Sequence, residues 1–155
     1  MCGIFGFQIK NNNYAIAQPL TSKLLKLSEE RGRESSGICL KYQNKHKIFK
    51  MPINGSKLSL KKNFFKTLEL PKNNNKNFIS IIGQCRLTTN GKAYIDDYNQ
   101  PVNYENVSLI HNGIILNINE IFKKILKKNI NDNLEISDTL YFAELINYLN
   151  KKNSN

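Results

Sequence analysis

The second residue of the chain is a cysteine that could act as a catalytic nucleophile. The sequence begins Met1-Cys2-Gly3, and removal of the initiator methionine would leave Cys2 with both a thiol and a free α-amine. An α-amine has a pKa of about 8 and can therefore accept the thiol proton near neutral pH. A mature chain that starts at Cys2 would carry a nucleophile and its own base. The alternative is that Cys2 is a small residue at the start of a buried strand.

Four short motifs further along the chain join this cysteine. In chain order they are RGRESSG at 31–37, RLTTNG at 86–91, HNG at 111–113 and SDT at 137–139. Together with Cys2 they resemble the glutaminase domain of class II glutamine amidotransferases, which include asparagine synthetase, glucosamine-6-phosphate synthase and amidophosphoribosyltransferase. The resemblance extends from Cys2 to about Leu149. Each motif is a weak match alone, but five features in the right order argue against coincidence.

The resemblance implies a reaction in which the Cys2 thiolate attacks the carboxamide carbon of glutamine. Ammonia leaves, and a γ-glutamyl thioester remains to be hydrolysed to glutamate. The tetrahedral oxyanion needs two fixed donors, and by resemblance these are the side-chain amide of Asn112 and the backbone N–H of Gly113. Asn-Gly is also a common turn dipeptide after a strand, so the pair has a purely structural interpretation as well.

Four further residues are implied to bind the glutamine substrate. Arg86 offers a planar pair of donors to the α-carboxylate, and arginine is rare here, with three arginines against 20 lysines. Its structural alternative is a surface ion pair. Asp138 supplies the anion that the α-ammonium requires, although Asp at the start of a helix also stabilises the helix dipole on its own account. Thr89 and Asn90 match positions that line the pocket, where some members of the family have a histidine in place of Asn90.

The histidines and the other two cysteines are expected to have no catalytic role. His111 adjoins the predicted oxyanion donors, but the α-amine already supplies a base, and an isolated histidine offers no second metal ligand. His46 is expected to be exposed among lysines. Cys39 and Cys85 are most simply buried small hydrophobic residues. We therefore expect neither a metal nor a cofactor.

Length and composition favour a single domain without a membrane or nucleic-acid partner. A chain of 155 residues suits one domain, here 1–155. The net charge of +11 could indicate an acidic partner, but a solvated lysine surface explains it as well, and no arginine-rich stripe indicates nucleic-acid binding. The three widely spaced cysteines predict neither a disulfide framework nor a zinc site. No segment has membrane-spanning length, and we expect a cytoplasmic location.

Hydrophobic patterning predicts the strands and loops that must position these residues. Strands are expected at 4–9, 37–42, 46–51, 78–85 and 107–111, the second and third forming a hairpin and the fourth being buried on both faces. That fourth strand places Arg86 at its end. The segment 88–106 has few apolar residues and predicts a functional loop, and 71–77 predicts an exposed one. The Asn99-Gln100-Pro101 tripeptide resembles an Asn-Gln-Pro of the family, and otherwise reads as an ordinary turn.

Helical spacing predicts three helices. The first has Leu20, Leu24 and Leu27 on one face after start signals at 19–22, the second spans 118–126, and the third begins at Ser137 and buries Phe142, Leu145, Ile146 and Leu149. In the last of these, Ser137 is the expected N-cap.

These elements predict an α+β fold. By resemblance it is an N-terminal nucleophile (Ntn) hydrolase αββα sandwich of mainly antiparallel sheets. A complete domain of the family continues past the helix after Asp138 with further strands, so we expect the C-terminal strands to be lacking. The leading hypothesis is a glutaminase that delivers ammonia to a separate synthase subunit. The alternative is a non-catalytic or truncated glutaminase-like subunit that binds a partner.

Overall fold

The computed structural model describes residues 2–43, 45–69, 78–87, 99–127 and 137–153. Over this part the chain has the expected α+β fold, with helices packed on antiparallel sheets. The strands are β1 (Gly3–Lys10), β2 (Ser35–Tyr42), β3 (Lys45–Met51), β4 (Phe78–Arg86), β5 (Val102–Tyr104) and β6 (Val107–Leu109). The helices are α1 (Ala17–Ser28), α2 (Gly55–Leu58), α3 (Lys62–Thr67), α4 (Ile118–Leu126) and α5 (Asp138–Asn153). Short 3₁₀ turns, η1 (Asn11–Ile16) and η2 (Glu29–Arg31), flank α1.

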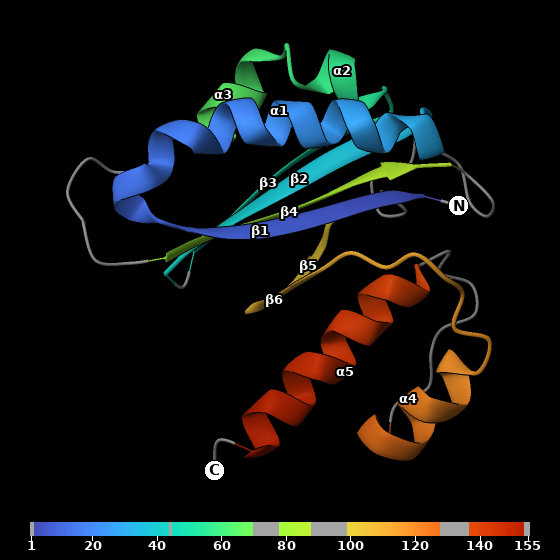
Figure 1. The fold of residues 1–155 in the computed structure, drawn as a ribbon. Helices are drawn as coiled ribbons and strands as arrows, with labels where there is room; N and C mark the ends of the chain where they lie inside the picture. The colour runs from blue at the N-terminus through green and yellow to red at the C-terminus, as the bar shows by residue number, and fades with distance from the viewer. Residues whose placement is uncertain (1, 44, 70–77, 88–98, 128–136, 154–155) are drawn as a thin grey trace.

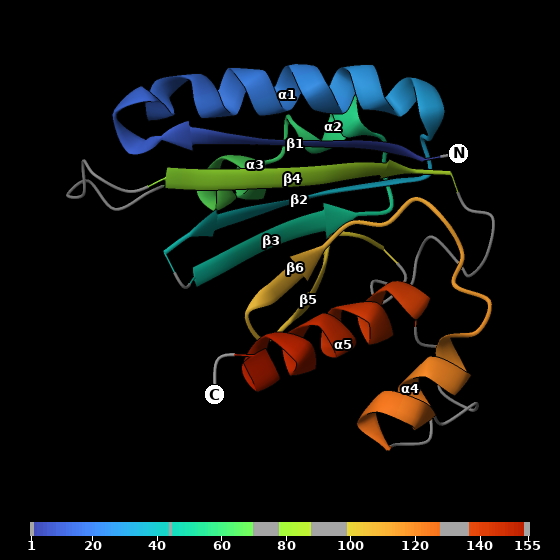
Figure 2. The same cartoon turned by 60° about the horizontal axis from the view of Figure 1, so that its bottom comes forward.

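The described elements lie in four layers. The main sheet has the strand order β1-β4-β2-β3, and every neighbouring pair is antiparallel. Helices α1, α2 and α3 cover one face of this sheet, and the β5–β6 hairpin lies on the other (Figure 1). Helix α5 contacts both hairpin strands and α4 contacts α5, which Figure 2 shows from a second side. The order of the layers is therefore helix, sheet, hairpin, helix.

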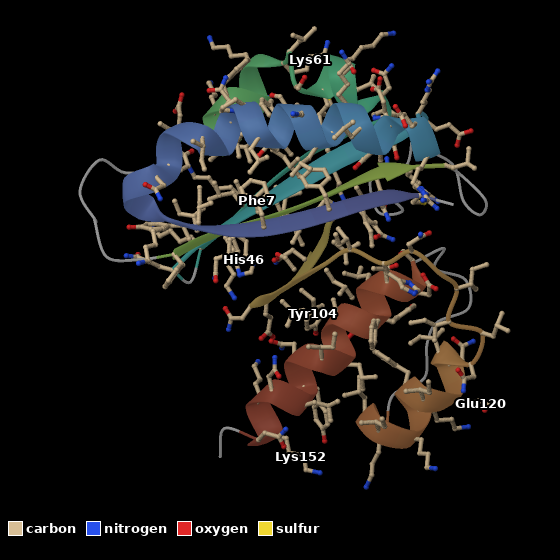
Figure 3. The ribbon with its side chains drawn as sticks, viewed as in Figure 1. Phe7, His46, Lys61, Tyr104, Glu120 and Lys152 are labelled. Carbon is tan, nitrogen blue, oxygen red and sulfur yellow. The ribbon has the colours of Figure 1, made fainter. Side chains whose placement is uncertain are left out.

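Strand β4 is central and divides its side chains between the two faces of the sheet. Ile79, Ile81 and Cys85 are fully buried in the core beneath α1. The alternate residues face the hairpin side, where Gln84 and Arg86 make the contacts described below. The expected strand at 78–85 and the hairpin at 37–51 are confirmed. Figure 3 shows the same division on two other strands of the sheet, with Phe7 of β1 directed toward α1 and His46 of β3 lying on the hairpin side.

Helix α1 begins earlier than predicted and buries a different face. It starts at Ala17, so Thr21 lies inside the helix and its hydroxyl donates to the Ala17 carbonyl at 2.6 Å. The buried residues are Ala17, Thr21 and Leu25, while Leu27 is 54% exposed. Leucine spacing predicted the wrong face because a small residue such as Ala17 lets a helix approach a sheet closely. The helix therefore packs on the sheet with the face that carries Ala17.

Helix α5 has the predicted cap but only part of the predicted buried face. Ser137 Oγ accepts a hydrogen bond from the Thr139 N–H at 3.2 Å, which confirms Ser137 as the cap. Leu145 is buried as expected, whereas Leu149 is 39% exposed. Asn147, which was not expected, is buried and donates to Glu105. No helix in the described ranges combines the length and the apolar character needed to cross a membrane.

The hairpin side differs most from the prediction. The strand expected at 107–111 ends at Leu109, and β5 lies within the segment 88–106 that predicted a loop. Residues 88–98 of that segment and the predicted loop at 71–77 lie outside the described residues.

Candidate active site

The backbone of Cys2 is bound by the side chain of Asn112. Asn112 Oδ1 accepts a hydrogen bond from the Cys2 nitrogen at 3.2 Å, and Asn112 Nδ2 donates to the Cys2 carbonyl at 3.3 Å. The thiol of Cys2 lies 3.8 Å from the Leu87 carbonyl oxygen, a weak S–H···O contact. Cys2 is half-buried and Asn112 is exposed, so the thiol lies at the surface beside a fixed carboxamide.

Two glycines allow the chain to close tightly around this end of the sheet. A Cβ atom at Gly3 would lie 2.2 Å from the carbonyl oxygen of Ser28 at the end of α1. A Cβ atom at Gly32 would lie 2.4 Å from the backbone of Arg86 and Leu87. Any side chain at either position would therefore push the ends of β1 and β4 away from the turn that follows α1. Gly32, the first glycine of the RGRESSG motif, thus has a packing role.

Arg86 lies at the same end of the sheet as Cys2. Gly3 pairs with Cys85, so Cys2 precedes and Arg86 follows the same cross-strand pair. The Arg86 guanidinium donates from Nη1 to Asn99 Oδ1 at 3.1 Å. Asn99 is fully buried, and its carbonyl accepts a hydrogen bond from Lys50 at 2.8 Å. Asn99 therefore orients the guanidinium, a role that sequence reasoning missed although it singled out the Asn-Gln-Pro tripeptide.

Asp138 is the first residue of α5 and already accepts two hydrogen bonds. Its Oδ2 accepts the Ile115 N–H at 2.9 Å, and its Oδ1 accepts the Thr139 hydroxyl at 3.2 Å. A carboxylate has about four acceptor positions, so these bonds fix its orientation and leave capacity for a further donor. The bond to Ile115 also ties α5 to the segment that contains Asn112 and Gly113.

The remaining predicted site residues divide between described and undescribed parts. Gly113 is exposed and follows Asn112 in the turn after β6. Thr89 and Asn90 lie outside the described residues. Within the described ranges, no three His, Cys, Asp or Glu side chains come close enough together to hold a metal ion.

The other two cysteines are buried, as expected. Cys85 is fully buried, and burial together with the charge of Glu29 raises the pKa of its thiol to about 12. Burial likewise raises the pKa of Cys39, whose thiol lies 3.3 Å from Ser108 Oγ. Both thiols are therefore held in the unreactive protonated form. Cys2 differs from them in being partly exposed.

The expectation that His46 is exposed was wrong. Its ring is half-buried between the main sheet and the hairpin, with Nδ1 2.5 Å from Ser108 Oγ. Burial, and to a smaller extent the charge of Lys41, lowers the pKa of His46. The lysine-rich neighbourhood suggested exposure, but the side chains of a strand alternate between faces and this one points inward.

No family model matches the chain, and no curated protein matches it. The motifs and the contacts described above are therefore the basis for a proposed function.

Proposed function

We propose that this chain is a class II glutamine amidotransferase domain, an Ntn hydrolase that releases ammonia from glutamine through a Cys2 thioester. The observation that carries the proposal is the paired contact of the Asn112 carboxamide with the Cys2 backbone. It brings the predicted nucleophile and a predicted oxyanion donor together across 110 residues of sequence. The layer order of helix, sheet, hairpin and helix supports the αββα assignment.

The chemistry begins with removal of Met1, which turns the Cys2 nitrogen into an α-amine. Asn112 Oδ1 accepts one N–H of that amine and so orients its lone pair, which takes the thiol proton. The resulting thiolate attacks the glutamine carboxamide carbon. Asn112 Nδ2 carries two hydrogens. One binds the Cys2 carbonyl, and the other is the donor we assign to the oxyanion, together with the Gly113 N–H.

Collapse of the tetrahedral intermediate releases ammonia after the amine returns its proton to the leaving nitrogen. Water then attacks the thioester with the same amine as base, the C–S bond breaks, glutamate is released and the thiol is regenerated. In this scheme Arg86 binds the α-carboxylate and Asp138 binds the α-ammonium. A glutaminase without an acceptor would waste glutamine, so the proposal includes delivery of ammonia to a separate synthase subunit.

Intact mass followed by a glutaminase assay tests the proposal. The purified protein should have the mass of a chain that starts at Cys2 and should convert glutamine to glutamate and ammonia. Cys2→Ser should lower the rate by several orders of magnitude, as loss of a nucleophile does.

The matched control is Cys39→Ser, which changes a buried thiol on the same sheet and should leave the rate nearly intact. Active protein that retains Met1 would contradict the mechanism. Protein that starts at Cys2 but does not hydrolyse glutamine would contradict the function itself.

A further inference from the structure

Both backbone polar groups of His111 are bound by glutamine side chains. Gln100 Oε1 accepts the His111 N–H at 2.6 Å, and Gln84 Nε2 donates to the His111 carbonyl at 3.0 Å. The carbonyl of His111 belongs to the peptide unit that leads into Asn112. Two side chains therefore fix the backbone immediately before the proposed oxyanion donors.

Both glutamines extend from well-anchored backbone. Gln84 lies on the central strand β4 and is 1% exposed. Gln100 lies between the fully buried Asn99 and Pro101. Its own side chain is oriented by a second bond, in which Nε2 donates to the Thr139 hydroxyl at 3.0 Å. The carboxamide oxygen is thereby turned toward His111.

Gln84 is poorly placed for stability alone. Its Oε1 atom is buried and makes no hydrogen bond in the described part of the chain. A buried acceptor without a donor destabilises a fold, whereas an apolar side chain of similar shape would avoid that cost. The bond from Nε2 to the His111 carbonyl is the interaction that an amide supplies at this position and an apolar side chain would not.

We propose that Gln84 and Gln100 are positioning residues that hold the backbone of His111 so that Asn112 and Gly113 meet the oxyanion. This inference rests on the proposed glutaminase function. Within the described residues, the hydrogen bonds of Cys2 are to Asn112 and Leu87 and not to either glutamine, and the proposal gives neither glutamine a direct chemical role. Their effect is on the placement of the donors, so it should appear in kcat and much less in KM, because the oxyanion exists only after attack.

The test compares three variants of the full chain by steady-state kinetics per folded molecule and by thermal melting. Gln84→Met removes the unpaired oxygen but also the donor to the His111 carbonyl. These two effects on stability oppose each other, so Tm should stay close to that of wild type. Gln100→Leu removes the bond to the His111 N–H. In both glutamine variants kcat should fall about 10- to 100-fold, because a small displacement of catalytic groups lowers the rate by about this factor. KM should change less than about 3-fold.

The matched control is Asn147→Leu, another buried amide, which lies on α5 and binds Glu105 away from the site. It should lower Tm and leave kcat per folded molecule unchanged. Wild-type kcat in both glutamine variants, or a loss no greater than that of the control, would overturn the positioning role. An inactive wild-type protein would instead overturn the glutaminase function, and this inference with it, before any variant is compared.

Discussion

The oxygen of the Asn112 carboxamide faces the nitrogen of Cys2, so exchanging that amide for a carboxylate tests the proposed base directly. In Asn112→Asp the acceptor remains 3.2 Å from the nitrogen but carries a negative charge. At that separation, and with the dielectric constant of water because Asn112 is exposed, Coulomb attraction to an α-ammonium is about 1.3 kcal/mol. This corresponds to a rise of about one unit in the pKa of the mature α-amine.

The sign of the effect follows from which form of the amine is catalytic. In the proposed mechanism the neutral amine accepts the thiol proton, and the added charge favours the protonated form of the amine. The rise of kcat/KM with pH should therefore move to higher pH by about one unit. The plateau should also fall by roughly 100-fold, about 3 kcal/mol, because a carboxylate cannot donate to the oxyanion.

Two further variants separate these effects. Asn112→Ala removes the donor without adding charge, so it should lower the plateau without moving the profile upward in pH. Asn117→Asp adds the same charge at an exposed position before α4 and should change neither. A wild-type pH profile in Asn112→Asp would refute the contact with the amine. A lower Tm with normal turnover in Asn112→Ala would leave Asn112 as a turn residue.

Three other outcomes can be measured with the same preparations. Arg86→Lys should raise KM for glutamine about 10-fold with a smaller change in kcat, because an ammonium cannot replace a planar bidentate donor. An unchanged KM would count against Arg86 as the ligand of the α-carboxylate. The pKa of His46 is lowered in the folded protein, so the unfolded chain binds a proton at His46 more readily than the folded chain does. The free energy of unfolding should therefore fall as the pH drops below about 6.5. Melting between about pH 8 and pH 5 should show a smaller fall in Tm for His46→Gln than for wild type, and equal falls would remove His46 as a cause. Iodoacetamide at neutral pH should modify Cys2 in the folded protein and spare Cys85, whose pKa is about 12, so prompt labelling of Cys85 would contradict its burial.

Local sequence patterns predicted the main sheet well. Alternating apolar residues located β1 and an apolar run located β4, and the end of that run placed Arg86 at the end of β4. Ser137 was recognisable as a cap because a serine side chain binds the N–H groups of its own helix. These features depend on neighbours within a few residues, and such information is present in any short stretch of sequence.

The faces of the helices were harder to predict. Leucine spacing indicated that Leu27 packs inward, but α1 buries Thr21 and leaves Leu27 exposed. Hydrophobic periodicity shows that a helix has one apolar side, but it locates that side only to within part of a turn. Which residues touch the sheet depends on how closely the helix can approach it, and that is a property of both packed surfaces.

The sequence by itself supplied the chemical groups of the site and their order along the chain. The tertiary structure decided how they meet: the Asn112 carboxamide on the Cys2 backbone, Asn99 on the guanidinium of Arg86, and two glutamines on His111. The presence of an Asn or Gln in the sequence does not indicate which group its carboxamide will bind, because the same group serves as a turn former, a surface residue or a backbone ligand. Its partner is fixed only when strand order and layer packing bring distant segments within hydrogen-bond distance.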